Sequence, residues 1–124
     1  MTGQAVFLLS VALGGAVGAL MRVLVGTVVS GPGDFPLNTF IVNFAGCFLI
    51  SLVYFSLGAM NPEIKGFLLI GVFGAFTTMS TFSLETINLY EAGRVGLALT
   101  NIALNTAVCL GAGFAGRALA LALA

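Results

Sequence analysis

Four long apolar segments fill most of this chain, and they constrain its fold more than any other feature. A helix that crosses a bilayer needs about 20 apolar residues, and the expected spans cover residues 5–29, 36–60, 64–90 and 95–122. Only 6% of the 124 residues are charged, whereas a soluble domain carries about 25%. The sequence therefore predicts one all-α integral membrane domain with four transmembrane helices and no soluble domain.

Short loops with strong turn chemistry separate the segments. Residues 30–34 read Ser-Gly-Pro-Gly-Asp, and residues 91–94 read Glu-Ala-Gly-Arg. Asn61-Pro62-Glu63 is typical of a helix start, with Asn as the cap and Pro in the first turn. The first segment follows no basic region and no convincing cleavage site, so we expect a retained helix rather than a signal peptide.

The few titratable residues argue against several function classes. The formal net charge is zero, so nothing points to a nucleic-acid partner. The chain has no His and no Cys-x-x-Cys spacing, which makes a transition-metal site improbable. Without a nucleophile–base pair or an aqueous domain, we do not expect an enzyme. Cys47 and Cys109 fall in apolar segments, and each is expected to act as a small apolar residue rather than as half of a disulfide.

The third segment contains an unusual polar stretch at residues 71–85, GVFGAFTTMSTFSLE. Two glycines precede five hydroxyl residues among the seven positions 77–83. Gly costs about 1 kcal/mol in a helix interior, and Ser and Thr compete for backbone groups. We predict that the third helix breaks between Gly74 and Met79, where irregular backbone must be buried by protein or line a water- or ion-filled space. The alternative is a continuous helix whose hydroxyls bond to neighbouring helices.

Polar residues in the other segments have two readings each. Arg22 either reaches toward the membrane interface or guards an aqueous vestibule that attracts anions. Asn43, beside Thr39, either binds helices together or lines a polar pathway. A polar stripe on one face of the fourth helix is formed by Asn101, Asn105 and Cys109.

The distribution of Lys and Arg shows almost no bias that would set the orientation of the chain in the membrane. Lys65 and Arg117 fall on one side of the membrane, and Arg22 and Arg94 on the other. We predict insertion in both orientations and an antiparallel homodimer; the alternative is that an unseen feature sets the orientation. Two broken third helices would meet at the dimer axis, and four freed carbonyl oxygens there would suit a small hard cation.

Three motifs give this chain a resemblance to a known family. They are Gly14-Gly15-xx-Gly18-Ala19-xx-Arg22, Asn38-Thr39-xxx-Asn43-xx-Gly46 and Gly71-xx-Gly74-xx-Thr77-Thr78-x-Ser80-Thr81-Phe82-Ser83-x-Glu85. Together they resemble the Fluc/CrcB fluoride channels over essentially the whole chain. The resemblance implies an antiparallel, dual-topology homodimer in the plasma or inner membrane of a prokaryote. Its two separate pores would export toxic fluoride passively from the cytoplasm.

The resemblance also implies roles for individual residues. A structural sodium ion at the dimer centre would be held by the backbone carbonyls of Gly74 and Thr77. The positions implied to line the pore, together with the neighbouring Thr39, are Asn43, Met79, Ser80, Thr81, Phe82 and Cys109. Arg22 would guard the vestibule. Four positions depart from the family pattern: Met79 replaces the first pore Phe, Ala75 a Gly, Asn38 a Gly and Cys109 a Ser.

Fluoride is a small, strongly hydrated anion, so its pore must replace water with hydrogen-bond donors. Amide and hydroxyl groups of Asn43, Ser80 and Thr81 are suitable donors, and Phe82 can present the positive edge of its ring. Met79 offers only weak C–H contacts, and we expect it to preserve conduction with an altered rate. Glu85 is a functional candidate: it is either protonated, or hydrogen-bonded to hydroxyls such as Ser83, or placed at the pore mouth.

Two other functions compete with the fluoride channel. A small multidrug-type exporter, which exchanges protons for a cationic substrate, also has four short spans and dual topology. That class depends on a carboxylate in its first helix, and residues 5–29 contain none. A structural subunit of a larger complex would use its polar stripes for assembly and would transport nothing alone.

Overall fold

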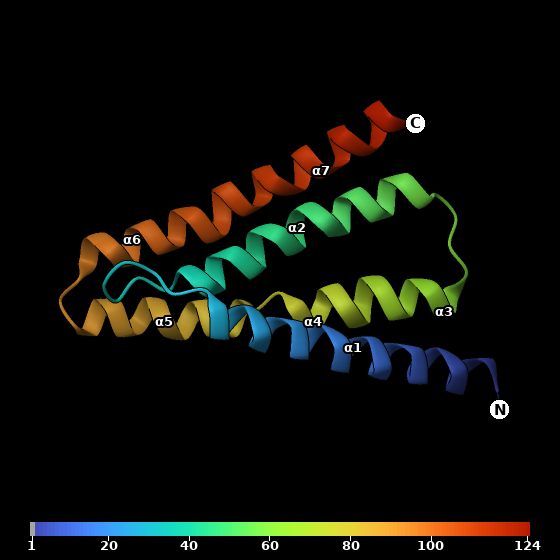
Figure 1. The fold of residues 1–124 in the computed structure, drawn as a ribbon, viewed down its shortest axis with the longest axis horizontal. Helices are drawn as coiled ribbons and strands as arrows, with labels where there is room; N and C mark the ends of the chain where they lie inside the picture. Colours follow the sequence, from blue (N-terminus) through green and yellow to red (C-terminus); the bar gives the residue numbers. More distant parts are fainter. Residues whose placement is uncertain (1) are drawn as a thin grey trace.

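Four membrane-length helical rods make up the fold, which a computed structural model describes for residues 2–124 (Figure 1). The rods run from Gly3–Val28, Leu37–Leu57, Pro62–Glu91 and Val95–Leu123, and no strand occurs within residues 2–124. The predicted all-α class with four helices able to cross a membrane is confirmed.

Two of the rods are built from several helical segments. The first two rods are the single helices α1, Gly3–Val28, and α2, Leu37–Leu57. The third rod consists of α3, Pro62–Lys65; the π-helical η1, Gly66–Phe73; α4, Gly74–Phe76; and α5, Met79–Glu91. The fourth consists of α6, Val95–Ala103; the π-helical η2, Leu104–Val108; and α7, Cys109–Leu123.

Local signals account for the boundary between the second and third rods. Gly58 has a φ of +59°, a left-handed conformation that stops α2 at Leu57, slightly before the predicted residue 60. The Asn61 side chain accepts a hydrogen bond from the Ile64 amide at 2.8 Å, and Pro62 is the first helical residue. The predicted cap at Asn61 is therefore confirmed.

Consecutive rods run in opposite directions, so the loops gather at the two ends of the molecule. Both termini and the 58–61 connection lie at one end, and the loops after α1 and α5 lie at the other (Figure 1). At the latter end Arg94 forms an ion pair with Asp34 and so joins the two loops. Lys65 and Arg117 therefore belong to the half with the termini, and Arg94 lies at the opposite end.

Glycines bring the rods into backbone contact. A Cβ added to Gly18 would lie 2.1 Å from the Val72 carbonyl oxygen, and one on Gly14 would lie 2.1 Å from that of Phe67. On the other side of the bundle, a Cβ on Gly116 would lie 2.2 Å from the carbonyl oxygen of Phe48. The predicted close packing at the Gly-xxx-Gly spacing of the first helix is present in the structure.

Two residues in the middle of the third rod are extended rather than helical. Thr77 has φ −80° and ψ 156°, and Thr78 has φ −150° and ψ 115°. The Thr77 amide still donates to the Phe73 carbonyl at 3.2 Å. Thr78 then caps α5, because its hydroxyl oxygen accepts a hydrogen bond from the Thr81 amide at 3.2 Å.

Candidate functional site

Asn43 from α2 supplies the hydrogen bonds that the extended backbone at Thr78 cannot make within a helix. The Thr78 amide donates to Asn43 Oδ1 at 2.7 Å, and Asn43 Nδ2 donates to the Thr78 carbonyl at 3.1 Å. Both residues are buried. Because unpaired backbone groups are costly when buried, this reciprocal pair stabilises the extended conformation.

The Asn43 amide is also the first member of a chain of buried amides. Asn43 Nδ2 donates to Asn105 Oδ1 at 2.8 Å, and Asn105 Nδ2 donates to Asn101 Oδ1 at 2.9 Å. Asn101 Nδ2 continues to the Thr86 hydroxyl at 3.0 Å. Both amide hydrogens of Asn43 are thus donated to protein oxygens. In this structure they therefore bind helices together, which is one of the two readings that the sequence left open, and donation by Asn43 to fluoride stays a prediction.

The extended residues release two carbonyl groups from helical pairing. In a continuous helix the Thr78 amide would bond to the Gly74 carbonyl, but here it donates to Asn43. The Thr81 amide would bond to the Thr77 carbonyl, but it donates to Thr78 Oγ1. Within residues 2–124 no cluster of three acidic, His or Cys side chains gathers that would hold a metal. Carbonyl oxygens are among the ligands that hard cations take.

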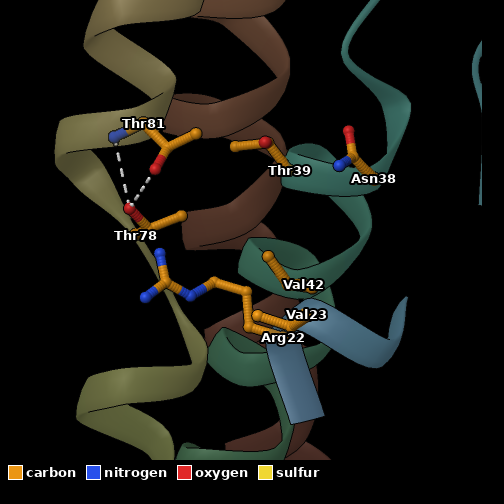
Figure 2. A pocket seen from close by; sticks show the side chains of 7 residues that line it. All are labelled: Arg22, Val23, Asn38, Thr39, Val42, Thr78 and Thr81. Carbon is orange, nitrogen blue, oxygen red and sulfur yellow. Dashed lines mark hydrogen bonds between the residues drawn. The ribbon is translucent and has the colours of Figure 1, made fainter. Parts of the chain in front are cut away.

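A cavity of about 270 Å³ lies on one side of Thr78 (Figure 2). Its lining residues are Arg22, Val23, Asn38, Thr39, Val42, Thr78 and Thr81. Figure 2 shows the Arg22 side chain extending toward Thr78. The Arg22 Nε atom is buried and has no hydrogen-bond partner within residues 2–124. Three Thr residues line the cavity, and the Thr81 hydroxyl keeps its hydrogen, because Thr78 donates to it. A cationic donor beside this hydroxyl makes the cavity suitable for a small anion.

A second cavity, of about 170 Å³, also reaches Thr78. It is lined by Asn43, Cys47, Thr77, Thr78, Met79, Phe82 and Asn105. Met79 and Phe82 thus share a cavity, although the Met79 side chain is 67% exposed and Phe82 only 8%. The Phe82 ring and the Met79 thioether form the apolar wall of this cavity, and the amides of Asn43 and Asn105 form its polar wall.

Glu85 accepts a hydrogen bond from the Thr39 hydroxyl at 2.7 Å. Its other carboxyl oxygen is buried and has no partner within residues 2–124. The hydroxyl group that pairs with Glu85 is therefore that of Thr39 in α2 and not that of Ser83. The Ser83 hydroxyl instead donates to the Met79 carbonyl at 2.9 Å. Glu85 also lines a third cavity, of about 250 Å³, together with Asp34 and Arg94 of the paired loops.

Some expected site residues lie outside these three cavities. Ser80 is exposed, and its hydroxyl lies 3.4 Å from that of Thr78. Cys109 is buried among the helices, and Gly74 is exposed without lining any of the three.

Sequence reasoning missed Thr78, Asn38 and Asn105 as lining residues. Two signals in the sequence could have identified them: Thr78 lies within the hydroxyl-rich run, and Asn105 belongs to the polar stripe of the fourth helix. Nothing local indicated which amide pairs with which backbone group.

Comparisons with known proteins place the chain among relatives of one family. Residues 9–117 match the family described as "CrcB-like protein, Camphor Resistance (CrcB)". A "Fluoride-specific ion channel FluC" of Ruminiclostridium cellulolyticum is 41% identical over 93% of this chain and 92% of its own length. Proteins of the same name from Cereibacter sphaeroides and Shewanella loihica are 43% and 45% identical, over 90% and 83% of this chain and 91% and 86% of their own lengths.

Proposed function

Since the chain belongs to the CrcB family, whose relatives described above are named fluoride-specific ion channels, we infer that it conducts fluoride passively across a membrane. It is a multi-pass membrane channel and not an enzyme. The observation that carries this conclusion is the cavity at Thr78, where the buried Arg22 Nε has no partner. An anion would satisfy that donor, which is otherwise costly to bury.

The cavity chemistry is compatible with a small anion such as fluoride. Thr81 Oγ1 accepts from the Thr78 hydroxyl at 2.9 Å, so the Thr81 hydrogen remains for another acceptor. We propose that this hydroxyl and the Arg22 guanidinium replace water around the ion, and that Thr39 would join them once its hydroxyl is released from Glu85. Ser80, Phe82 and Met79 would provide further weak contacts, and Cys109 would support α2 behind them. Weak, repeated contacts allow the ion to leave as well as to enter.

We propose that the working unit is an antiparallel homodimer with two pores. Met79, Ser80 and Gly74 are exposed in the single chain, although the family resemblance assigns them to the pore or the dimer centre. A second copy placed over this face would complete both cavities around each interrupted third rod. Insertion in both orientations, which the balanced Lys and Arg residues favour, would supply that copy.

A sodium ion at the dimer centre is the proposed cofactor. The Gly74 and Thr77 carbonyls, which lose their helical partners, would hold it, and a second chain would double the oxygen donors. The bound ion would join the two subunits and offset anion repulsion inside the membrane. Replacing Na⁺ by N-methylglucamine should lower the thermal stability of the purified dimer, and an unchanged melting temperature would argue against the site.

We place the channel in the inner or plasma membrane of a prokaryote, where it would release cytoplasmic fluoride. The bacterial relatives support this location. The multidrug-type exporter is not favoured, because α1 contains no carboxylate for proton exchange.

Efflux from liposomes tests the function directly. Purified protein in fluoride-loaded liposomes should release fluoride rapidly, as read by a fluoride electrode, and should retain chloride in a parallel sample. Release of neither ion by a folded dimer would contradict the channel, and equal release of both would contradict its selectivity.

A further inference from the structure

A groove between α2 and α7 takes no part in the site described above. It has a volume of about 230 Å³ and is lined by Ser51, Phe55, Leu110, Gly113, Phe114 and Arg117. Gly113 leaves a gap in the α7 surface, where an added Cβ would lie 3.4 Å from Ser51 Oγ. Leu110 and Phe114 are 64% and 65% exposed, so the groove opens on the outer surface of the chain.

One end of the groove carries a positive charge that the protein does not neutralise. The Arg117 guanidinium carbon lies 5.3 Å from the centroid of the Phe55 ring, in a cation–π arrangement. The ion pair formed within residues 2–124 joins Arg94 to Asp34 at the opposite end of the bundle, and it leaves Arg117 without a carboxylate partner. The guanidinium is therefore oriented by an aromatic ring and remains available to an anion.

Because Arg117 lies near the end of a rod long enough to cross a membrane, we expect it at the membrane–water boundary. It precedes the helix end at Leu123 by six residues, or about 9 Å at 1.5 Å per residue. The neighbouring end of α2 carries Tyr54, whose ring meets that of Phe55 edge-on with centroids 5.1 Å apart. Tyr is enriched at the depth of lipid headgroups. From Arg117 toward Leu110 the groove runs along α7 and becomes apolar.

We propose that this groove binds one anionic phospholipid. The lipid phosphate would accept hydrogen bonds from the Arg117 guanidinium, whose planar donors match phosphate oxygens. One acyl chain would lie over Gly113 between Leu110 and Phe114. The cationic headgroup end and the apolar inner end match the two parts of the lipid, and a charged groove at this depth is typical of anionic-lipid sites.

Native mass spectrometry of the detergent-purified protein tests the proposal. Dioleoyl-phosphatidylglycerol and dioleoyl-phosphatidylcholine would each be titrated against wild type, Arg117→Gln and Arg117→Lys. We expect one phosphatidylglycerol per chain to bind wild type at least tenfold more tightly than phosphatidylcholine. Arg117→Gln should abolish this preference and Arg117→Lys should keep much of it. The matched control is Lys65→Gln, which removes a cation from the same half of the bundle but outside the groove.

Three outcomes would overturn the proposal. The first is equal binding of the two lipids by wild type, and the second is an unchanged preference in Arg117→Gln. The third is loss of the dimer in Arg117→Gln without added lipid, which would assign the groove to a second copy of the chain. Fluoride efflux by Arg117→Gln should stay at the wild-type rate, so a failure here is distinct from a failure of the channel function.

Discussion

At the scale of single residues, Asn43 has more influence on the site than its place in a pore lining suggests. Its side chain bonds to both backbone groups of Thr78 and to Asn105. One amide thus holds the extended backbone of the third rod and joins it to the fourth. The donors left for an anion come from other residues, above all Arg22 and Thr81.

Replacing Asn43 by Ala should destabilise the protein by about 2 kcal/mol or more, because buried backbone groups of Thr78 lose their partners. Thermal unfolding in detergent, followed by circular dichroism, measures the effect. Asn88→Ala is the control, since Asn88 is an exposed amide of the third rod, to which Thr78 also belongs. A melting temperature equal to that of the control would contradict the stabilising role of Asn43.

Replacing Arg22 by Gln should lower fluoride efflux by about tenfold at low ionic strength, because the cavity loses its cation. The difference from wild type should shrink in high salt, where charge attraction is screened. Initial efflux rates from liposomes at two ionic strengths provide the measurement. A salt-independent loss would mean that Arg22 acts through packing instead.

At the scale of elements, glycine contacts set the distance between the first and third rods. Gly14 and Gly18 of α1 meet the carbonyl groups of Phe67 and Val72, and both glycines are buried. This contact places Arg22, one turn beyond Gly18 on α1, beside the extended residues of the third rod. Helix packing and site geometry therefore depend on the same small residues.

Gly18→Ala should destabilise the fold by about 1–3 kcal/mol, because its Cβ would lie 2.1 Å from a backbone oxygen that cannot move freely. Gly15→Ala should be neutral or slightly stabilising, since nothing lies within 4 Å of a Cβ at that position. The melting temperatures of the two variants in one detergent give the comparison. Equal values would show that α1 shifts to accommodate the methyl group.

At the scale of the whole molecule, part of the proposed pore lining lies on the surface of the single chain. Met79 and Ser80 are exposed although they follow directly after the extended residues. The loops and the Lys and Arg residues divide between the two ends of the bundle. The proposed second, inverted copy would account for both features, and its orientation can be measured.

Ser30→Arg adds a cation to the end that carries Arg94, and it should favour one orientation. Ala92→Cys, combined with Cys47→Ser and Cys109→Ser to remove the two native thiols, provides a single thiol that reports the orientation when it is probed in intact cells with a membrane-impermeant reagent. About half of the wild-type copies and a strongly altered share of Ser30→Arg copies should be labelled. Efflux by Ser30→Arg alone should fall and should recover on co-expression with Thr2→Lys. Uniform labelling of wild type would contradict dual topology.

Sequence by itself determined the features that depend on composition and on near neighbours. The number of spans follows from apolar length, and the start of the third rod from Asn61-Pro62. These signals act within a few residues, so they do not depend on tertiary contacts and can be read from the sequence. The hydroxyl-rich stretch likewise drew attention to the region that contains Thr78.

Tertiary structure alone decided which polar groups meet. Asn43 pairs with Thr78 across 35 residues, and Thr39 with Glu85 across 46. Such pairs depend on how the four rods are rotated and offset relative to one another. This rotation and offset are set by glycine contacts between helices rather than by any local pattern. For that reason the sequence predicted the residue types of the site but left open whether Asn43 binds helices together or lines a polar pathway, and it did not identify the partners of Asn43.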